Sequence, residues 1–160
     1  MFSFFPLAPV IYFGIRLSVI DLQTHRLPNR LVAWFAASEA LILGFLSWVS
    51  GDFGRMINAL GVATATLGIY LVLFLLSRGA FGMGDVKFAF PLGLCIGWFA
   101  PELWLTSILV TLLIAGLVAV IGILFKKINR NTAIAFGPFM FAGTLLSLLL
   151  DYYLIRSSYL

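Results

Sequence analysis

The sequence predicts an all-α, polytopic integral membrane protein with about six transmembrane helices, and two observations support this prediction. Of its 160 residues, 62% are hydrophobic and only 10% are charged, whereas soluble domains carry about 25% charged residues. The apolar residues also fall into long stretches separated by short polar connections. A soluble fold of this length could not cover so much apolar surface, but a lipid bilayer solvates it directly.

Six apolar stretches are expected to cross the membrane as helices. A spanning helix needs about 20 mainly apolar residues, with a range of roughly 17–25, and six stretches approach or reach this length: 4–20, 31–49, 57–76, 86–99, 103–125 and 133–155. An open strand edge would leave unpaired backbone groups in lipid, so each stretch is expected to be helical. The fourth is the shortest, and its Pro91 and Gly93 are expected to kink or loosen it. Because every connection is short, residues 1–160 are expected to form a single membrane-embedded domain.

Basic residues gather on one predicted side of the membrane. By this topology, one side holds Arg55 and Arg156, and the other holds the remaining eight of the ten lysines and arginines, namely Arg16, Arg26, Arg30, Arg78, Lys87, Lys126, Lys127 and Arg130. The positive-inside rule then places the odd-numbered connections in the cytoplasm and both termini outside. We therefore expect a multi-pass protein of the plasma (inner) membrane. Since the basic residues are scattered between apolar segments, the net charge of +4 does not indicate nucleic-acid binding.

The chain is poor in side chains that bind transition metals or form disulfides. It has one cysteine, Cys95, and one histidine, His25, which leaves too few ligands for a transition-metal site. Cys95 has no partner for an intramolecular disulfide and belongs to no CxxC pair. We expect neither a metal nor a cofactor, and no serine–histidine or cysteine–histidine pair indicates nucleophilic catalysis.

Two polar loops carry the remaining candidates for chemistry. The first follows Asp21, at the expected cytoplasmic end of the first helix. It contains Pro28, which turns the chain before the second helix because proline lacks an N–H and restricts its neighbour. The second loop ends at Asp85 and has three glycines in six residues, Gly79, Gly82 and Gly84. Glycines allow a tight or left-handed backbone path at the membrane surface.

Asp21 and Asp85 lie on the same predicted side of the membrane and at similar depth. A carboxyl group near hydrocarbon has a raised pKa because desolvation disfavours its charged form, and two carboxyl groups close together can share one proton near neutral pH. Such a pair suits peptide hydrolysis, in which one aspartate takes a proton from water while the other donates one to the scissile carbonyl. Each acid also has a simpler explanation: Asp21 as an ordinary interfacial residue, and Asp85 as a helix N-cap.

Three motifs resemble those of the type IV prepilin peptidase family and occur in the same order. They are Asp21 with Arg26-Leu27-Pro28-Asn29, then Gly82-Met83-Gly84-Asp85-Val86-Lys87, then Phe136-Gly137-Pro138-Phe139. The first resembles the family's D…R-[IL]-P-N segment, the second matches GxGDxK, and the third resembles PFGP, with Ala135 in place of the leading proline. GxGD alone is weak, since presenilin-like proteases also carry it, but the three motifs together are specific.

The resemblance implies a GxGD intramembrane aspartic endopeptidase that removes the short basic leader from prepilin or pseudopilin precursors at the cytoplasmic face. Asp21 and Asp85 would be its catalytic pair, supported by Gly82, Gly84, Lys87, Arg26, Pro28, Asn29, Gly137 and Pro138. Many members also carry a region with paired CxxC motifs and N-methylate the new terminus. This sequence has no such region, so the resemblance implies a short form, similar to Tad/Flp-type prepilin peptidases, without N-methyltransferase activity.

Two other functions stay open. A small multi-spanning transporter or channel component would line a polar path with Asp21, Asp85 and Glu39, because ionisable groups within membrane helices often mark such paths. Glu39 lies about 12 Å along the second helix from Leu31 at 1.5 Å rise per residue. A general signal-peptide-type intramembrane protease would share the GxGD aspartate but leaves the other two motifs unexplained.

Overall fold

The computed structural model of the protein describes residues 5–77, 81–126 and 134–156, and all regular structure in these residues is helical. Its elements are, in chain order, α1 (Leu7–Thr24), α2 (Asn29–Ser50), α3 (Phe53–Leu76), α4 (Met83–Phe99), the 3-10 helix η1 (Pro101–Leu103), α5 (Trp104–Leu124), α6 (Gly137–Leu150) and the π-helix η2 (Asp151–Arg156). The all-α prediction is therefore confirmed. Three basic residues used to predict the topology, Arg78, Lys127 and Arg130, lie outside the described residues.

Local chemistry explains where the first helices begin and end. α1 continues past its predicted end to Thr24 and stops where His25 adopts a left-handed conformation with φ 50°. Asp21 therefore lies in the last turn of α1, at the C-terminal end of the helix as the sequence predicted. α2 begins directly after Pro28, whose ψ of 121° is extended. Gly51 closes α2 with φ 70°, a left-handed value that glycine adopts at little cost.

The last predicted helix, 133–155, begins later in the structure than expected. Residues 134–136 are not helical, and α6 begins at Gly137. Pro138 stands in the first turn of α6, where its missing N–H is tolerated because that N–H would have no partner within the helix. The proline, and not the apolar composition, therefore explains where the helix begins.

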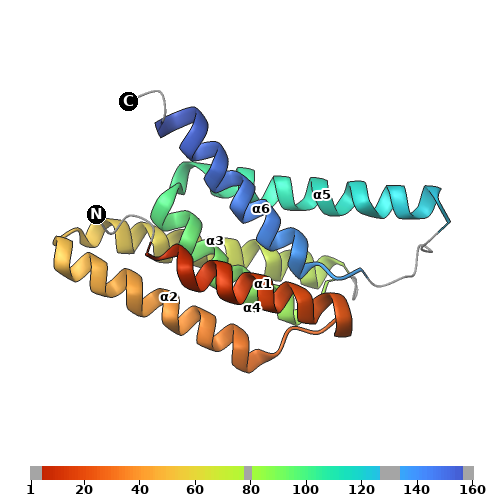
Figure 1. The fold of residues 1–160 in the computed structure, drawn as a ribbon, viewed down its shortest axis with the longest axis horizontal. Helices are drawn as coiled ribbons and strands as arrows, with labels where there is room; N and C mark the ends of the chain where they lie inside the picture. The colour runs from red at the N-terminus through yellow and green to blue at the C-terminus, as the bar shows by residue number, and fades with distance from the viewer. Residues whose placement is uncertain (1–4, 78–80, 127–133, 157–160) are drawn as a thin grey trace.

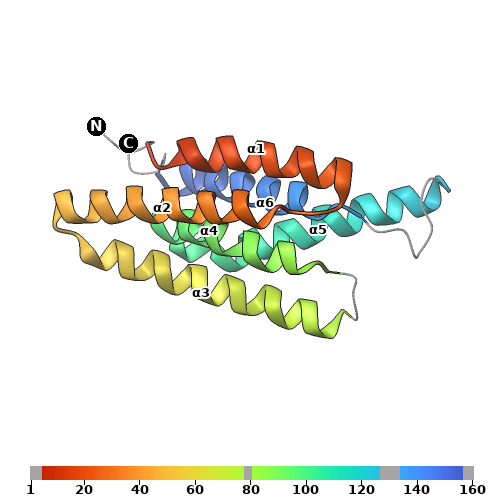
Figure 2. The ribbon, with the colours of Figure 1, turned by 90° about the horizontal axis from the view of Figure 1, so that it is seen from below.

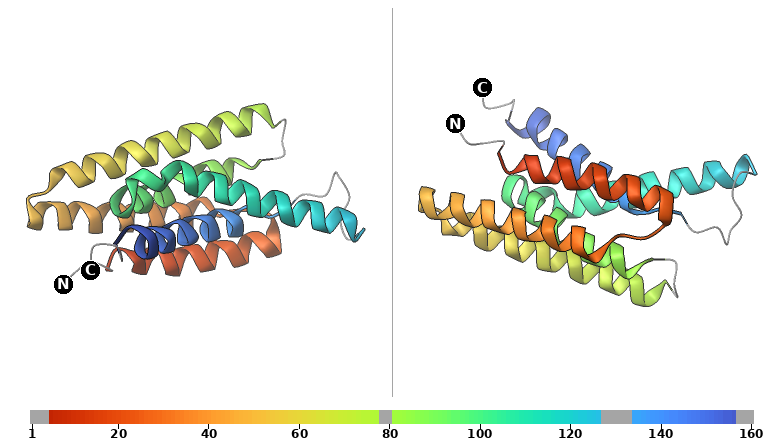
Figure 3. Two further views of the ribbon diagram at one scale, coloured as in Figure 1. Left: turned by 90° about the horizontal axis from the view of Figure 1, so that it is seen from above. Right: turned by 60° about the horizontal axis from the view of Figure 1, so that its bottom comes forward.

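The helices run along the long axis of the molecule, with α6 inclined to the others (Figure 1). The C-terminal ends of α1, α3 and α5 and the N-terminal ends of α2, α4 and α6 lie at one end, on the right of Figure 1; we call it the loop end. The start of α1 and the end of η2 lie at the opposite end. α5 extends beyond the other helices at the loop end (Figures 2 and 3). The odd-numbered connections thus leave from one end of the bundle, as the predicted topology requires.

α4 is the most buried helix and occupies the centre of the bundle. It packs most extensively on α3 and also contacts α2 and α6. The helix continues through Pro91. A Cβ added at Gly93 would lie 2.7 Å from the Cα of Ala63, and one added at Gly97 would lie 2.7 Å from the Cα of Ala59. These two glycines let the backbone of α4 approach that of α3 closely.

Much of the outer surface is apolar, as lipid requires. α1, α2, α3 and residues 101–124 are each long and apolar enough to cross a membrane, and at most 33% of the spanning window of each is buried within the protein. Trp34, Leu41 and Leu113, for example, are 67%, 73% and 71% exposed. Soluble proteins rarely expose apolar patches of this extent, so the chain is a membrane protein. About six spans were predicted; within the described residues, four helices are long and apolar enough to cross a membrane, while α4 has 17 residues and α6 has 14 before η2 continues it.

Candidate active site

Asp21 lies on α1, and the start of α6 holds its carboxylate. The side chain is 4% exposed, and its Oδ2 accepts the backbone N–H of Gly137 at 2.8 Å. This N–H belongs to the first turn of a helix, where backbone donors have no partner within the helix and a negative charge is favourable. A Cβ added at Gly137 would lie 3.0 Å from the same oxygen, so glycine permits the close approach. The contact joins positions 116 residues apart in the sequence.

Asp85 lies in the first turn of α4, and the loop before that helix holds its carboxylate. The side chain is 8% exposed, and its Oδ2 accepts the backbone N–H of Gly82 at 3.0 Å. Gly82 is the residue that precedes the helix, so Asp85 is the third residue of α4. The simpler explanation of Asp85 as an N-cap is therefore wrong. The acid pairs with the donor of the cap residue from inside the helix, as the acidic member of a capping box does.

An aromatic cluster joins the two segments that hold the aspartates. Phe81 directly precedes Gly82, and Phe136 directly precedes Gly137. The two phenylalanine rings meet edge to face, with their centroids 4.7 Å apart. Tyr70 of α3 contacts both rings, at centroid distances of 6.5 Å and 6.1 Å. The backbone N–H groups that hold the two aspartates thus belong to neighbouring segments of the fold.

The two carboxyl groups interact electrostatically. Asp85 precedes the apolar segment 86–99, and burial raises the pKa of its carboxyl from an ordinary 3.8 to about 6. The hydrogen bond from Gly82 lowers this pKa in part, and the nearby charge of Asp21 raises it. Asp85 therefore retains its proton to higher pH than an isolated aspartate would, as expected for an acid near another acid in a poorly hydrated site.

The two loops that carry the first two motifs contact each other directly. A Cβ added at Gly84 would lie 3.0 Å from the Cβ of Leu27, so only glycine fits without displacing the neighbouring loop. Close by in the sequence, Nζ of Lys87 donates to Oδ1 of Asn29 at 3.0 Å. Both contacts pair the GxGDxK segment with the Arg-Leu-Pro-Asn segment. Residues of the two motifs that look unrelated in the sequence therefore pack against each other.

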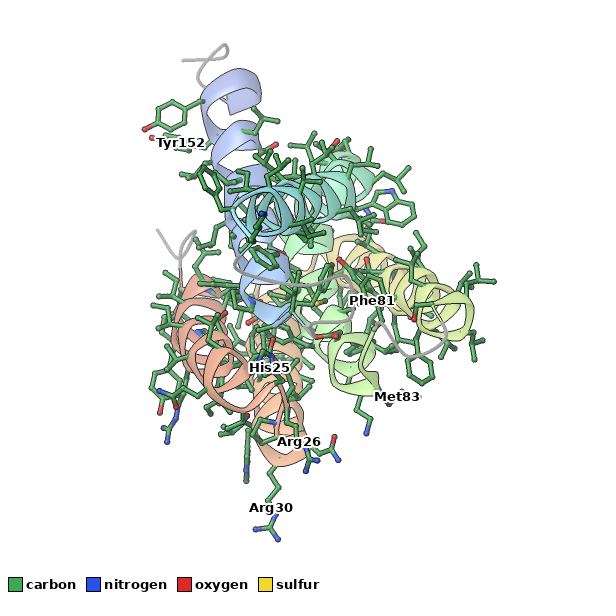
Figure 4. All side chains as sticks on the ribbon, turned by 90° about the vertical axis from the view of Figure 1, so that its right-hand side faces the viewer. His25, Arg26, Arg30, Phe81, Met83 and Tyr152 are labelled. Carbon is green, nitrogen blue, oxygen red and sulfur yellow. The ribbon has the colours of Figure 1, made fainter. Side chains whose placement is uncertain are left out.

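Other residues of the motifs lie around the loop end. Figure 4 looks onto this end and shows Arg26 and Arg30 at its periphery. Arg26 is exposed, and the Thr24 hydroxyl donates to its carbonyl oxygen at 3.2 Å. His25 is exposed as well, and its N–H donates to the carbonyl oxygen of Asp21 at 2.8 Å. These residues close α1 just after the buried aspartate.

Glu39 lies midway along α2, away from the loop end, and is fully buried. In the part of the chain that the structure describes, neither of its carboxylate oxygens has a hydrogen-bond partner. Cys95 of α4 is buried as well. The two do not form a metal site, since no group of three histidine, cysteine, aspartate or glutamate side chains gathers within the described ranges. Glu39 therefore belongs to the packed interior and not to the aspartate pair.

Sequence reasoning missed the contributions of Tyr70 and Phe81. One signal was available for Phe81, because a phenylalanine directly precedes each glycine that holds an aspartate, in Phe81-Gly82 and in Phe136-Gly137. Tyr70 offered no comparable signal, since it stands within a long apolar stretch among other large side chains.

The fold and the site together define a helical membrane protein with a pair of buried aspartates at one end of its bundle. The sequence profile of the type IV leader peptidase family matches residues 9–124, a range that includes both aspartates. The chain therefore belongs to the type IV leader peptidase family. The resemblance seen in the three motifs is confirmed at the level of the family.

Two curated relatives resemble the chain over most of its length. A prepilin leader peptidase/N-methyltransferase of Legionella pneumophila is 31% identical over 146 residues, which cover 86% of this chain and 47% of the relative. A protein of the same name from Bacillus subtilis (strain 168) is 25% identical over 148 residues, which cover 91% of this chain and 55% of the relative. The chain thus spans about half the length of these relatives. No solved structure matches it.

Proposed function

We propose that this chain is an intramembrane aspartic endopeptidase that removes the leader peptide from type IV prepilin or pseudopilin precursors. The observation that carries the proposal is the pair of buried aspartates, Asp21 and Asp85, which come from two helices and lie at one end of the bundle. The names of the two relatives support the class of substrate. We propose as supporting residues Gly82, Gly84, Lys87, Arg26, Pro28, Asn29, Gly137 and Pro138.

In the proposed reaction, the two acids divide the proton transfers between them. Asp21, held at the N-terminus of α6, takes a proton from the attacking water. Asp85, whose pKa is raised to about 6, carries a proton and donates it to the scissile carbonyl oxygen. When the tetrahedral intermediate breaks down, Asp21 gives its proton to the leaving amine and Asp85 recovers one from the hydroxyl group.

We also propose that the loop end faces the cytoplasm and that both termini lie outside. Eight of the ten basic residues fall on the loop-end side of the predicted topology, and cytoplasmic connections carry an excess of lysine and arginine. The leader of the precursor would then meet the aspartates from the cytoplasm. To test this, a reporter enzyme that is active only on the side of the membrane opposite the cytoplasm is fused to the C-terminus. The reporter is expected to be active.

Co-expression of this chain with a prepilin tests the peptidase proposal. The wild-type chain is expected to shorten the prepilin, which is seen as a gel shift and as a new N-terminus by mass spectrometry. General acid–base groups contribute about 10²–10⁴-fold to rate, so Asp21→Asn and Asp85→Asn are each expected to slow conversion by at least about 10²-fold. Both changes keep the shape of the side chain, so the variants should insert at the wild-type level.

Asp52→Asn is the matched control. Asp52 is the exposed N-cap of α3, where its carboxylate accepts the N–H of Arg55 at 3.2 Å, and asparagine caps a helix as well as aspartate does. This variant is expected to convert the prepilin at the wild-type rate. Wild-type conversion by an inserted Asp21→Asn or Asp85→Asn variant would show that the catalytic assignment is wrong. Cleavage of ordinary signal peptides in place of prepilins would favour a general intramembrane protease.

A further inference from the structure

Tyr70 lies on α3, a helix that contributes neither aspartate, but its ring reaches both segments that hold them. The side chain is 2% exposed. Its ring centroid lies 6.5 Å from that of Phe81 and 6.1 Å from that of Phe136, with interplanar angles of 65° and 62°. Those two rings meet each other at 4.7 Å. Edge-to-face contacts of this kind are attractive and depend on direction, so the three rings hold one another in place.

The hydroxyl of Tyr70 ties this ring cluster to α5. It forms a hydrogen bond with the side chain of Thr111. Thr111 in turn lies within hydrogen-bond distance of its own helix, since its hydroxyl donates to the carbonyl oxygen of Ser107 at 2.8 Å. The side chain of Tyr70 is therefore tied to α5 through its hydroxyl and to Phe81 and Phe136 through its ring.

Each phenylalanine of the cluster directly precedes the glycine whose N–H holds an aspartate. Consecutive Cα atoms are about 3.8 Å apart, so a displaced ring carries the neighbouring glycine with it. The Gly82 N–H lies 3.0 Å from Asp85 and the Gly137 N–H lies 2.8 Å from Asp21. Hydrogen bonds of this type extend to about 3.2 Å, so a small displacement is enough to break them.

We propose that Tyr70 is a positioning residue of the active site, whose ring sets the separation of the two glycine N–H groups that hold Asp85 and Asp21. This inference rests on the proposed peptidase function. Tyr70 acts through Phe81 and Phe136 and not by contact with the precursor. The ring does the positioning through its two edge-to-face contacts, and the hydroxyl adds an attachment to α5 that the positioning does not require.

Two substitutions at this position separate the ring from the hydroxyl. Tyr70→Leu removes both edge-to-face contacts. Because a misplacement of about 1 Å costs about 10²-fold in rate, kcat for prepilin cleavage is expected to fall about 10²-fold. KM is expected to stay within about twofold, since the binding surface for the precursor is unchanged. Tyr70→Phe retains both ring contacts, so its kcat is expected to stay within about threefold of wild type.

The measurement is kcat and KM of the full chain in lipid vesicles with a purified prepilin. Tyr12→Leu is the matched control, because Tyr12 is 55% exposed on α1, and it is expected to behave as wild type. If Tyr70→Leu matches this control, or if Tyr70→Phe loses as much activity as Tyr70→Leu, the proposal is overturned. Phe136→Leu removes the same contact from the side of α6 and is expected to lower kcat similarly; it serves as the test if Tyr70→Leu does not fold.

Hydrogen exchange at the Gly82 and Gly137 amides gives a readout that does not depend on catalysis. Tyr70→Leu is expected to speed exchange at both amides by at least about tenfold relative to Tyr70→Phe, because local opening becomes easier. If the wild-type chain cleaves no prepilin but this exchange result holds, the peptidase proposal fails and the positioning of the two N–H groups by Tyr70 stands. Unchanged exchange in Tyr70→Leu overturns the positioning role.

Discussion

Replacing Gly93 by alanine is expected to force α3 and α4 apart. A Cβ at this position would lie 2.7 Å from the Cα of Ala63 and 3.1 Å from Oγ1 of Thr66. Carbon atoms in contact normally lie about 3.5–4.0 Å apart, so the two backbones must separate by about 1 Å. The nearest atom belongs to the backbone and cannot rotate away. Since α4 also carries Asp85, the same movement disturbs the proposed catalytic pair.

The size of the effect follows from two opposing terms. An added methyl group in a tightly packed interior costs about 1–3 kcal/mol, while alanine gains up to about 1 kcal/mol over glycine in helix propensity. The expected net loss is about 1–2 kcal/mol. For proteins of about 150–250 residues, each kcal/mol corresponds to about 2–4 °C in Tm, so Gly93→Ala should unfold roughly 2–8 °C below wild type.

Thermal unfolding of the purified protein in detergent measures this difference. Gly68→Ala is the matched control on α3, because a Cβ there meets nothing within 4 Å, and it is expected to keep or raise Tm. Prepilin cleavage by the same samples should fall for Gly93→Ala and not for Gly68→Ala. If Gly93→Ala unfolds at or above the temperature of Gly68→Ala, the close contact between α3 and α4 is refuted.

Three further predictions concern stability and rate. The pKa of Asp85 is raised from 3.8 to about 6. Between these two pH values the folded chain holds a proton that the unfolded chain has lost, so the free energy of unfolding falls as pH rises through this window. The Tm of Asp85→Asn relative to wild type should therefore increase from about pH 4 to about pH 7, and a constant difference would contradict this. In Gly84→Ala the new Cβ pushes against Leu27, so prepilin cleavage should slow about tenfold. Gly61→Ala is the control, because a Cβ there meets no atom within 4 Å, and it should cleave at the wild-type rate. Equal rates for the two variants would refute the contact between Gly84 and Leu27. Glu39→Met should keep or raise Tm, because a buried polar group without a partner costs about 1–3 kcal/mol, and a drop of more than about 2 °C would reveal a partner.

Much of the fold could be predicted from the apolar stretches alone. The predicted ends of the second, third and fourth helices, at Val49, Leu76 and Phe99, lie within one residue of the observed ends. The predicted start of the fourth helix was less accurate, since Val86 was predicted and α4 begins at Met83. The polar loop begins the helix through its own capping bonds, and composition does not register such bonds.

The site was only partly accessible to sequence reasoning. The motifs singled out both aspartates and Gly137 but did not indicate that the Gly137 N–H binds the carboxylate of Asp21. They also passed over Tyr70, because an aromatic residue inside an apolar stretch looks the same whether it faces lipid or another ring. Gly93 was expected to kink or loosen its helix, and the close contact with Ala63 of α3 could not be predicted because it depends on which helix packs against it.

The apolar stretches alone indicate that this chain is helical and embedded in a membrane. In lipid every backbone N–H and C=O needs a partner within the helix, so composition and length are sufficient for that conclusion. The packing of the helices, in contrast, brings the start of α6 to Asp21, the loop before α4 to Asp85, and Tyr70 into contact with both segments. These contacts join distant parts of the chain, and they depend on how whole helices fit together, which no local pattern of residues records.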